Sequence, residues 1–202
     1  MKGFVFSVLL LSLVCGGFFA DTSHAAAAKE TRMALPAPQK KGGMPLMEAL
    51  NARHANRKIS NKKPVDMQTL SNLLWATWGV NRPDGKRTAP TAMNKQEIQV
   101  YAAIESGVWL YDGNKNELVQ VLQDDVRSKF GGVPVTLLFV APANGTISGL
   151  HAGSLYQNAG LFCASAGLAN VVKITGRHAL KDMLTFPDKY DVLVIQCIGW
   201  PE

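Results

Sequence analysis

Cysteine and histidine are scarce in this sequence of 202 residues, which has three cysteines and four histidines. The histidines show no metal-ligand spacing, and the cysteines are too few for a structural zinc site, so no metal site is predicted. Cys15 lies in the N-terminal apolar segment, whereas Cys163 and Cys197 have apolar neighbours. We expect Cys163 and Cys197 to be buried free thiols, although two cysteines in an oxidising compartment could also pair.

Long apolar runs are also missing beyond the first twenty-odd residues, which argues against a stable membrane span. The start of the chain has a positive Met1-Lys2, an apolar segment over 3–19 and small residues over 23–28. This order predicts a secretory signal peptide over residues 1–25, cleaved after Ala25 or alternatively Ala27, and hence a periplasmic or secreted protein. Two alternatives stay open, a lipid anchor at Cys15 and an uncleaved membrane anchor.

Several catalytic and binding motifs are absent as well. The sequence contains no Gly-x-Ser-x-Gly segment for an acyl-transfer nucleophile, and residues 85–88 lack the first glycine of a phosphate loop. The net charge of +6 and a pI of about 9.3 favour an acidic ligand. Because the basic residues are not interleaved with aromatics, no nucleic-acid partner is predicted.

The periodicity of the remaining chain predicts an α+β domain over residues 45–202, preceded by a flexible lead-in over 26–44. Helices are expected over 46–53, from an Asp66 cap to Trp78, over 152–168 and over 177–184. Strands are expected over 98–104, 108–111, 117–122, 133–141, 170–174 and 192–198. The short turns between the first three strands indicate an antiparallel meander, and the apolar run 133–141 is typical of a strand buried on both faces.

Glycines recur every seven residues in the helix expected over 152–168, at Gly153, Gly160 and Gly167. Seven residues are almost two helical turns, so these small residues would form one stripe. Close packing within the core and a helix-to-helix subunit interface explain the stripe equally well.

The most concentrated positive charge follows the first helix, where Arg53, His54, Arg57 and Lys58 lie within six residues. Such a turn either faces water or binds an anion, and the planar arginine fork suits a phosphate monoester. Arg53 and Arg57 are four residues apart, so on a helical turn they would share one face.

Five segments in order resemble the flavin-dependent nitroreductase family. Residues 50–58 with the helix around 70–75 resemble its opening Arg-[Arg/His]-Ser-x-[Arg/Lys] turn, and residues 89–96 resemble its Ala-Pro-Ser-x-x-Asn-x-Gln segment. Residues 156–168 are similar to its Gln-Asn…Ala-x-x-x-Gly-Leu helix, residues 170–173 to its flavin-facing strand, and residues 194–201 to its closing strand. Residues 81–88 and 108–112 resemble the branch with thiazoline and oxazoline dehydrogenases.

This resemblance implies a nitroreductase-like α+β fold with a mainly antiparallel central sheet flanked by helices, a homodimer, and FMN as the cofactor. It implies that the basic turn holds the FMN phosphate, while residues 89–96 reach the flavin ring from the neighbouring subunit. The cofactor-binding residues that it implies are Arg53, His54, Ala55, Arg57, Pro90, Thr91, Ala92, Asn94, Gln96, Asn170 and Val171.

The implied function is exported two-step hydride or electron transfer between a small-molecule donor and acceptor. The flavin carries that chemistry, so no side chain is named as a catalyst, and Asn94 is expected to tune the ring. Three departures from the family pattern are Ala55 in place of serine, Ala166 in place of an acid, and the end of the sequence at Glu202. These departures keep open a flavin- or anion-binding protein without turnover, and a purely structural dimer.

Overall fold

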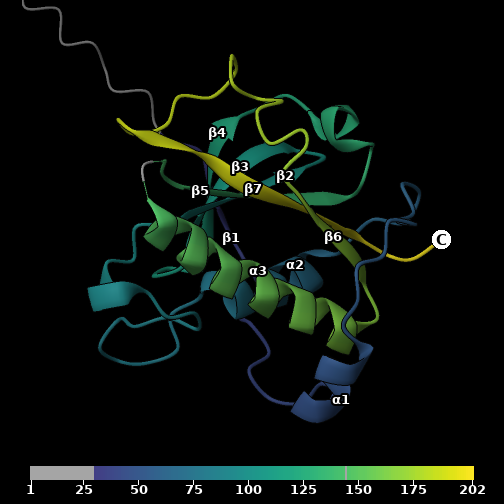
Figure 1. Cartoon of the computed structure of the whole chain (residues 1–202). Helices are drawn as coiled ribbons and strands as arrows, with labels where there is room; N and C mark the ends of the chain where they lie inside the picture. The colour runs from purple at the N-terminus through teal and green to yellow at the C-terminus, as the bar shows by residue number, and fades with distance from the viewer. Residues whose placement is uncertain (1–29, 144) are drawn as a thin grey trace, which may run out of the picture.

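An antiparallel sheet organises the computed structural model, which describes residues 30–143 and 145–202 (Figure 1). Its seven strands lie in the order β1-β4-β3-β2-β5-β7-β6, and every neighbouring pair is antiparallel. Their bounds are β1 (Arg32–Ala34), β2 (Gln99–Ile104), β3 (Gly107–Asp112), β4 (Glu117–Leu122), β5 (Val135–Pro142), β6 (Ala169–Lys173) and β7 (Tyr190–Gly199). The predicted α+β class and antiparallel sheet are confirmed, while the predicted signal peptide lies outside the described residues.

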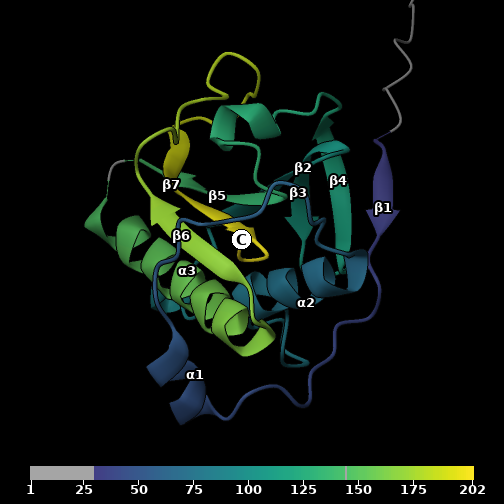
Figure 2. The same ribbon diagram turned by 90° about the vertical axis from the view of Figure 1, so that its right-hand side faces the viewer.

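Three α-helices flank the sheet, α1 (Leu46–Ala52), α2 (Met67–Trp78) and α3 (Thr146–Ala166), together with two short 3-10 turns, η1 (Ala92–Asn94) and η2 (Arg127–Phe130). The helix α2 forms as predicted, because Asp66 caps its first turn by accepting the backbone N–H of Thr69 at 2.9 Å. The helix α3 begins six residues earlier than predicted. Figure 2 shows α2 and α3 on the same side of the sheet.

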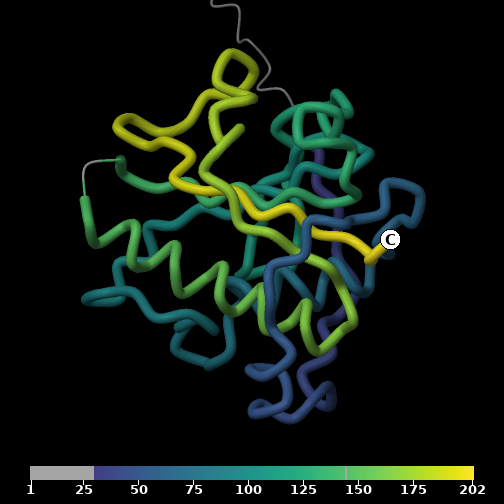
Figure 3. Tube along the Cα trace, turned by 45° about the vertical axis from the view of Figure 1, so that its right-hand side comes forward, coloured from purple at the N-terminus to yellow at the C-terminus, as the bar shows by residue number. Residues whose placement is uncertain are grey.

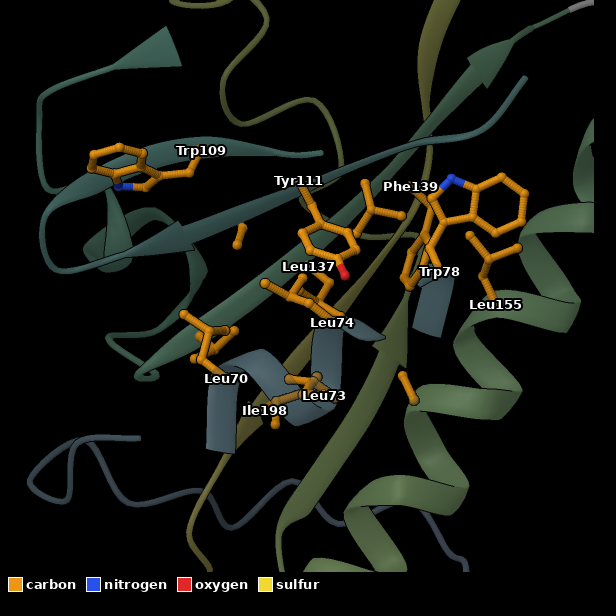
Figure 4. Close-up of a cluster of buried hydrophobic side chains, with 14 of the residues drawn as sticks. Leu70, Leu73, Leu74, Trp78, Trp109, Tyr111, Leu137, Phe139, Leu155 and Ile198 are labelled. Carbon is orange, nitrogen blue, oxygen red and sulfur yellow. The ribbon is translucent and has the colours of Figure 1, made fainter. Parts of the chain in front are cut away.

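The core has two parts, one on each face of the sheet. Leu70, Leu73 and Leu74 of α2, Leu155 of α3 and Phe139 of β5 belong to one buried cluster on one face of the sheet (Figure 4). On the other face, alternate residues of the same strands pack under η2 and the loop between β6 and β7. Both faces of β5 are therefore buried, as its continuous apolar run predicts.

The two cysteines lie in different parts of this core. Cys163 of α3 packs on the helical face of the sheet, and Cys197 of β7 packs on the opposite face. Both are buried and free, which confirms the prediction of free thiols. Burial raises the pKa of the Cys163 thiol to about 12, so this thiol stays protonated and unreactive in the folded protein.

The lead-in and the predicted helix over 177–184 differ from expectation. Residues 32–34 form β1 at the sheet edge, where Met33 pairs with Leu118, and Ser71 donates to the carbonyl of Pro36. Pairing with the edge of β4 supplies backbone hydrogen bonds that sequence periodicity does not reveal. Residues 177–184 form successive turns instead of a helix, with Leu180 anchored in the core. So short a segment gains little from helical propensity alone.

The glycine stripe is shorter than predicted. Gly167 adopts the left-handed conformation with φ 70° and ends α3, so it terminates the helix instead of lying on its face. Gly153 and Gly160 remain within α3. The glycine at 167 is therefore explained by the helix terminus, and only Gly160 lies beside a predicted site residue, Arg53.

Candidate functional site

The predicted basic turn lies between the end of α1 and the strand β6. The helix ends at Ala52, and Arg53 already has an extended backbone with φ −64° and ψ 117°. The backbone N–H of Asn56 donates to the carbonyl of Asn170 at 2.8 Å. Because this bond draws the chain along β6, residues 54–58 are not helical, and the predicted helical face shared by Arg53 and Arg57 is wrong.

A pocket of about 190 Å³ opens between this turn, the end of α3 and β6. His54, Asn56 and Asn170 supply most of its polar lining. The Nδ1–H of His54 donates to the carbonyl of Ala52 at 2.8 Å, which leaves Nε2 available to a ligand. Asn56 belongs to the segment 50–58 that resembles the family's opening turn, but sequence reasoning did not select it as a site residue.

The arginines of the turn are exposed, and the ion pairs found among residues 30–143 and 145–202 involve neither Arg53 nor Arg57. Arg53 lies beside α3, because a Cβ built on Gly160 would be 3.7 Å from Arg53 Cδ and 3.8 Å from Asn170 Oδ1. Unpaired guanidinium groups next to a polar pocket fit a phosphate. Arg53, Ala55 and Arg57 do not line this pocket.

Asn170 is held in place by a buried residue that sequence reasoning missed. Gln196 of β7 is fully buried, and its Nε2 donates to Asn170 Oδ1 at 2.9 Å. Val171 packs in the core with 4% of its surface exposed. A ligand can therefore reach Val171 only through its backbone, which lies on β6 at the edge of the sheet. A single glutamine within the apolar stretch 192–198 is the signal that could have indicated Gln196.

The second group of predicted residues forms a tight turn around η1. Met93, Asn94 and Gln96 have positive φ angles of 52°, 52° and 47°. Residues other than glycine rarely adopt this conformation, and clusters of it occur where surrounding contacts fix a functional segment. The backbone N–H of Gln96 donates to Thr91 Oγ1 at 3.1 Å, which closes the turn. Pro90 and Ala92 form the entry to this turn and are exposed.

A buried histidine–carboxylate pair supports the turn from α3. The backbone N–H of Ala92 donates to His151 Nε2 at 2.8 Å, so Nε2 carries no proton and Nδ1 does. That Nδ1–H donates to Glu97 Oε1 at 2.5 Å, and the two side chains are only 7% and 12% exposed. Sequence reasoning considered His151 only as a candidate metal ligand, so it missed this role. The available signal was an acidic residue, Glu97, directly after the predicted site residue Gln96.

An arginine supports the turn from the opposite end. Arg87 lies over the ring of Trp78 at 4.7 Å and donates through Nη1 to the Trp78 carbonyl. Its Nε donates to Gln96 Oε1 at 2.7 Å. Burial lowers the pKa of Arg87 from its usual value. Gly113 permits this packing, since a Cβ there would lie 2.4 Å from Arg87 Nη1.

The structure does not bring the two groups into one pocket. His151 contacts the turn around Asn94, whereas Gly160 lies beside Arg53. These two positions on α3 are about 14 Å apart along the helix axis, at about 1.5 Å per residue. None of residues 90–96 lines the pocket at the basic turn. The predicted residues therefore form two half-sites on one chain.

The structure is thus an α+β protein whose predicted site residues form two half-sites, and comparisons with known proteins show its family. The family model described as "Nitroreductase family" matches residues 50–200. The chain belongs to this family. Within residues 30–143 and 145–202, no helix is long and apolar enough to cross a membrane, and no group of three or more metal-binding side chains occurs.

Three similar proteins illustrate the range of the family. A crystal structure from Ralstonia eutropha JMP134, described as a "putative nitroreductase", is 34% identical, covers 88% of this chain and 93% of its own, and has a TM-score of 0.78. "Putative nitroreductase MJ1384" of Methanocaldococcus jannaschii is 26% identical over 86 residues, which are 40% of this chain and 43% of that protein. The chain thus matches less than half of this relative.

A third protein, from Desulfovibrio desulfuricans, was crystallised in complex with FMN. It is 17% identical, covers 79% of this chain and 88% of its own, and has a TM-score of 0.55. This similarity concerns the fold alone. The finer resemblance to thiazoline and oxazoline dehydrogenases stays a prediction.

Proposed function

We propose that this protein is an exported FMN-dependent oxidoreductase that binds its flavin between two subunits of a homodimer. The observation that carries the proposal is the pair of half-sites, an unpaired cationic turn at a polar pocket and a strained turn that presents Asn94. Family membership supports the cofactor, since a relative with this fold was crystallised with FMN.

The residues present fit FMN in a simple division of roles. When bound, FMN supplies the hydride and electron chemistry. Arg53, His54 and Arg57 hold the phosphate with charge-assisted hydrogen bonds, and Ala55 adds only a backbone group. Asn94 and the backbone of residues 170–171 orient the ring, while Thr91 and Gln96 keep Asn94 in place. The electron donor and the electron acceptor that react with the flavin are small molecules. The protein contributes no acid–base side chain.

Exposed apolar side chains support the dimer. On α1, Leu46 and Met47 are 64% and 74% exposed, and on α3 Leu150 is 66% exposed. Met93, next to Asn94, is 82% exposed. These residues flank both half-sites, and apolar surface of this kind is stabilised when a partner covers it. A two-fold axis would place the turn at Asn94 of one subunit at the basic turn of the other.

Export is proposed from residues 1–25 alone. An exported protein meets little NAD(P)H, so a different electron donor is expected in its compartment. Mass spectrometry of the protein purified from its native host tests this proposal. A mature N-terminus at residue 26 or 28 supports it, and an intact N-terminus contradicts it.

Reconstitution with FMN tests the cofactor and the dimer together. We expect a yellow protein whose absorption bleaches with dithionite or NADH and returns in air, and which light scattering shows as a dimer. If the protein is yellow but no electron donor bleaches its flavin in turnover, it is a flavin-binding protein without catalytic activity. Protein that takes up no FMN contradicts the proposed function, and a monomer of about 20 kDa that retains FMN contradicts the shared site.

A further inference from the structure

A chain of hydrogen bonds runs from Arg87 through Gln96 to Asn94. Arg87 Nε donates to Gln96 Oε1 at 2.7 Å, and Gln96 Nε2 donates to Asn94 Oδ1 at 2.9 Å. Gln96 Nε2 also lies 3.3 Å from the carbonyl of Gly85. Gln96 thus uses both ends of its side-chain amide, whereas Asn94 uses only the oxygen end of its amide.

The direction of this chain follows from the chemistry of arginine. A guanidinium group only donates, so the group that faces Arg87 must be the amide oxygen of Gln96. The amide nitrogen of Gln96 must then face Asn94 and Gly85, and the Gly85 carbonyl, which can only accept, requires the same orientation. Asn94 consequently accepts through Oδ1, and its Nδ2 group remains for a ligand.

The surroundings make this orientation hard to reverse. Arg87 is held by the Trp78 carbonyl and ring and lies against Gly113, so it has little freedom to turn away. Gln96 is fixed by its own backbone bond to Thr91. Asn94 itself is exposed, so its free amide is accessible from outside the subunit.

We infer that Arg87 and Gln96 are positioning residues that set Asn94 as a hydrogen-bond donor, so that it binds an acceptor atom of the flavin ring rather than the flavin N3–H. The inference rests on the proposed function, and it specifies the ligand atom that Asn94 recognises. A hydrogen-bond donor at a ring carbonyl favours the electron-rich reduced flavin. The chain of hydrogen bonds from Arg87 through Gln96 to Asn94, called the relay below, therefore raises the reduction potential of the bound cofactor.

Gln96→Glu reverses the relay while keeping the contact with Arg87. A carboxylate still accepts from the guanidinium, but it cannot donate to Asn94 Oδ1. The Asn94 amide then turns to donate to residue 96 and presents Oδ1 to the ligand. We expect FMN to bind about tenfold more weakly, since a lost hydrogen bond is replaced by two facing acceptors. The midpoint potential of bound FMN should fall, and the unfolding temperature of the apoprotein should stay within a few degrees.

Further variants separate the relay from charge and folding effects. Lys95→Gln makes the same change in net charge at the exposed neighbouring position, and we expect a smaller potential shift and little change in affinity. Arg87→Lys keeps a donor-only group and should bind FMN far better than Arg87→Met, which has none. In an Asn94→Ala background, Gln96→Glu should have no further effect on affinity beyond the Lys95→Gln control.

The outcomes distinguish the inference from the function beneath it. If the wild type binds no FMN, the proposed function and the inference both fail. If the wild type binds FMN and Gln96→Glu has the same affinity and potential, the relay alone is overturned. An effect of Gln96→Glu that persists in full without Asn94 also overturns the relay, because it would then act by charge.

Discussion

The two half-sites differ in how much of their structure is fixed before a ligand arrives. The basic turn over 53–58 is extended and exposed, and its arginines have no ion-pair partner among the described residues. The turn over 91–96 has three residues with positive φ, and it is supported by His151 on one side and Arg87 on the other. The arginine side chains of the first half-site have no ion-pair partner among the described residues, whereas the side chains of the second half-site are held by several hydrogen bonds.

This difference indicates a division of labour. A phosphate is a strong, nearly symmetrical acceptor, so flexible cations can bind it in more than one arrangement. A flavin ring has an ordered edge of hydrogen-bond donors and acceptors. A group that recognises this edge must therefore have its orientation already set. Preorganisation of Asn94 avoids an ordering cost at the moment of binding. We therefore expect loss of the buried contacts that support the second half-site to affect folding, and substitutions at the basic turn to affect only ligand affinity.

The strongest test of this contrast is His151→Leu. The change leaves the buried carboxylate of Glu97 and the N–H of Ala92 without their partner. A buried charged group without a partner destabilises the fold by about 3 kcal/mol. Urea unfolding of the apoprotein should show a loss of this size.

A matched control for His151→Leu exists on the surface. His178 pairs with Asp191 at 2.9 Å, but both side chains are more than 40% exposed (44% and 43%). His178→Leu should change the free energy of unfolding by less than about 1 kcal/mol, because exposed pairs contribute little. Equal effects of the two variants would show that the pair at Glu97 does not support the turn.

The second test removes charge from the basic turn through Arg53→Ala. A charge-assisted hydrogen bond contributes about 1.5–3 kcal/mol, so FMN affinity should fall about tenfold or more. Riboflavin lacks the phosphate, and its affinity should be almost unchanged by this substitution. Fluorescence titration of both flavins measures the difference, and urea unfolding should show a stability close to that of the wild type.

Arg57→Ala extends this test to the second arginine of the turn, which, like Arg53, does not line the pocket. A loss equal to that of Arg53→Ala means that the turn closes around the phosphate on binding. Arg127→Ala is the control, since Arg127 is already paired with Asp125 at 2.7 Å. If neither Arg53→Ala nor Arg57→Ala weakens FMN binding, the basic turn is only a solvated surface.

Local patterns in the sequence predict most of the fold. The Asp66 cap, the alternation of β2 to β4 and the apolar run of β5 are determined by neighbours in the chain, and the structure confirms each of them. The strand β1 and the turns over 177–184 depend on partners far away in the sequence. Edge pairing with β4 and the burial of Leu180 have no local signature.

The site shows the same limit more sharply. Family resemblance selects Arg53, His54, Asn94 and Asn170, because these positions belong to a linear motif. Apart from Gln96, it does not select the residues that orient them. His151 lies 59 residues from Ala92, and Gln196 lies 26 residues from Asn170. Such supporting contacts join segments that are distant in the sequence. The bridge between Ile59 and Pro201 is another example, because it joins the end of the chain to the segment after α1 (Figure 3).

The smallest expected effect concerns Ala55, where the family pattern has serine. Ala55 is exposed within the basic turn, so a hydroxyl there meets no steric obstacle from a buried neighbour. One added neutral donor contributes about 0.5–1.5 kcal/mol, so Ala55→Ser should tighten FMN binding by less than about tenfold. Riboflavin affinity should not change, because the hydroxyl would act on the phosphate. Ala55→Val adds bulk without a donor and should not tighten FMN binding. An equal gain for riboflavin, or for Ala55→Val, would place residue 55 away from the phosphate and leave the contrast between the half-sites resting on Arg53.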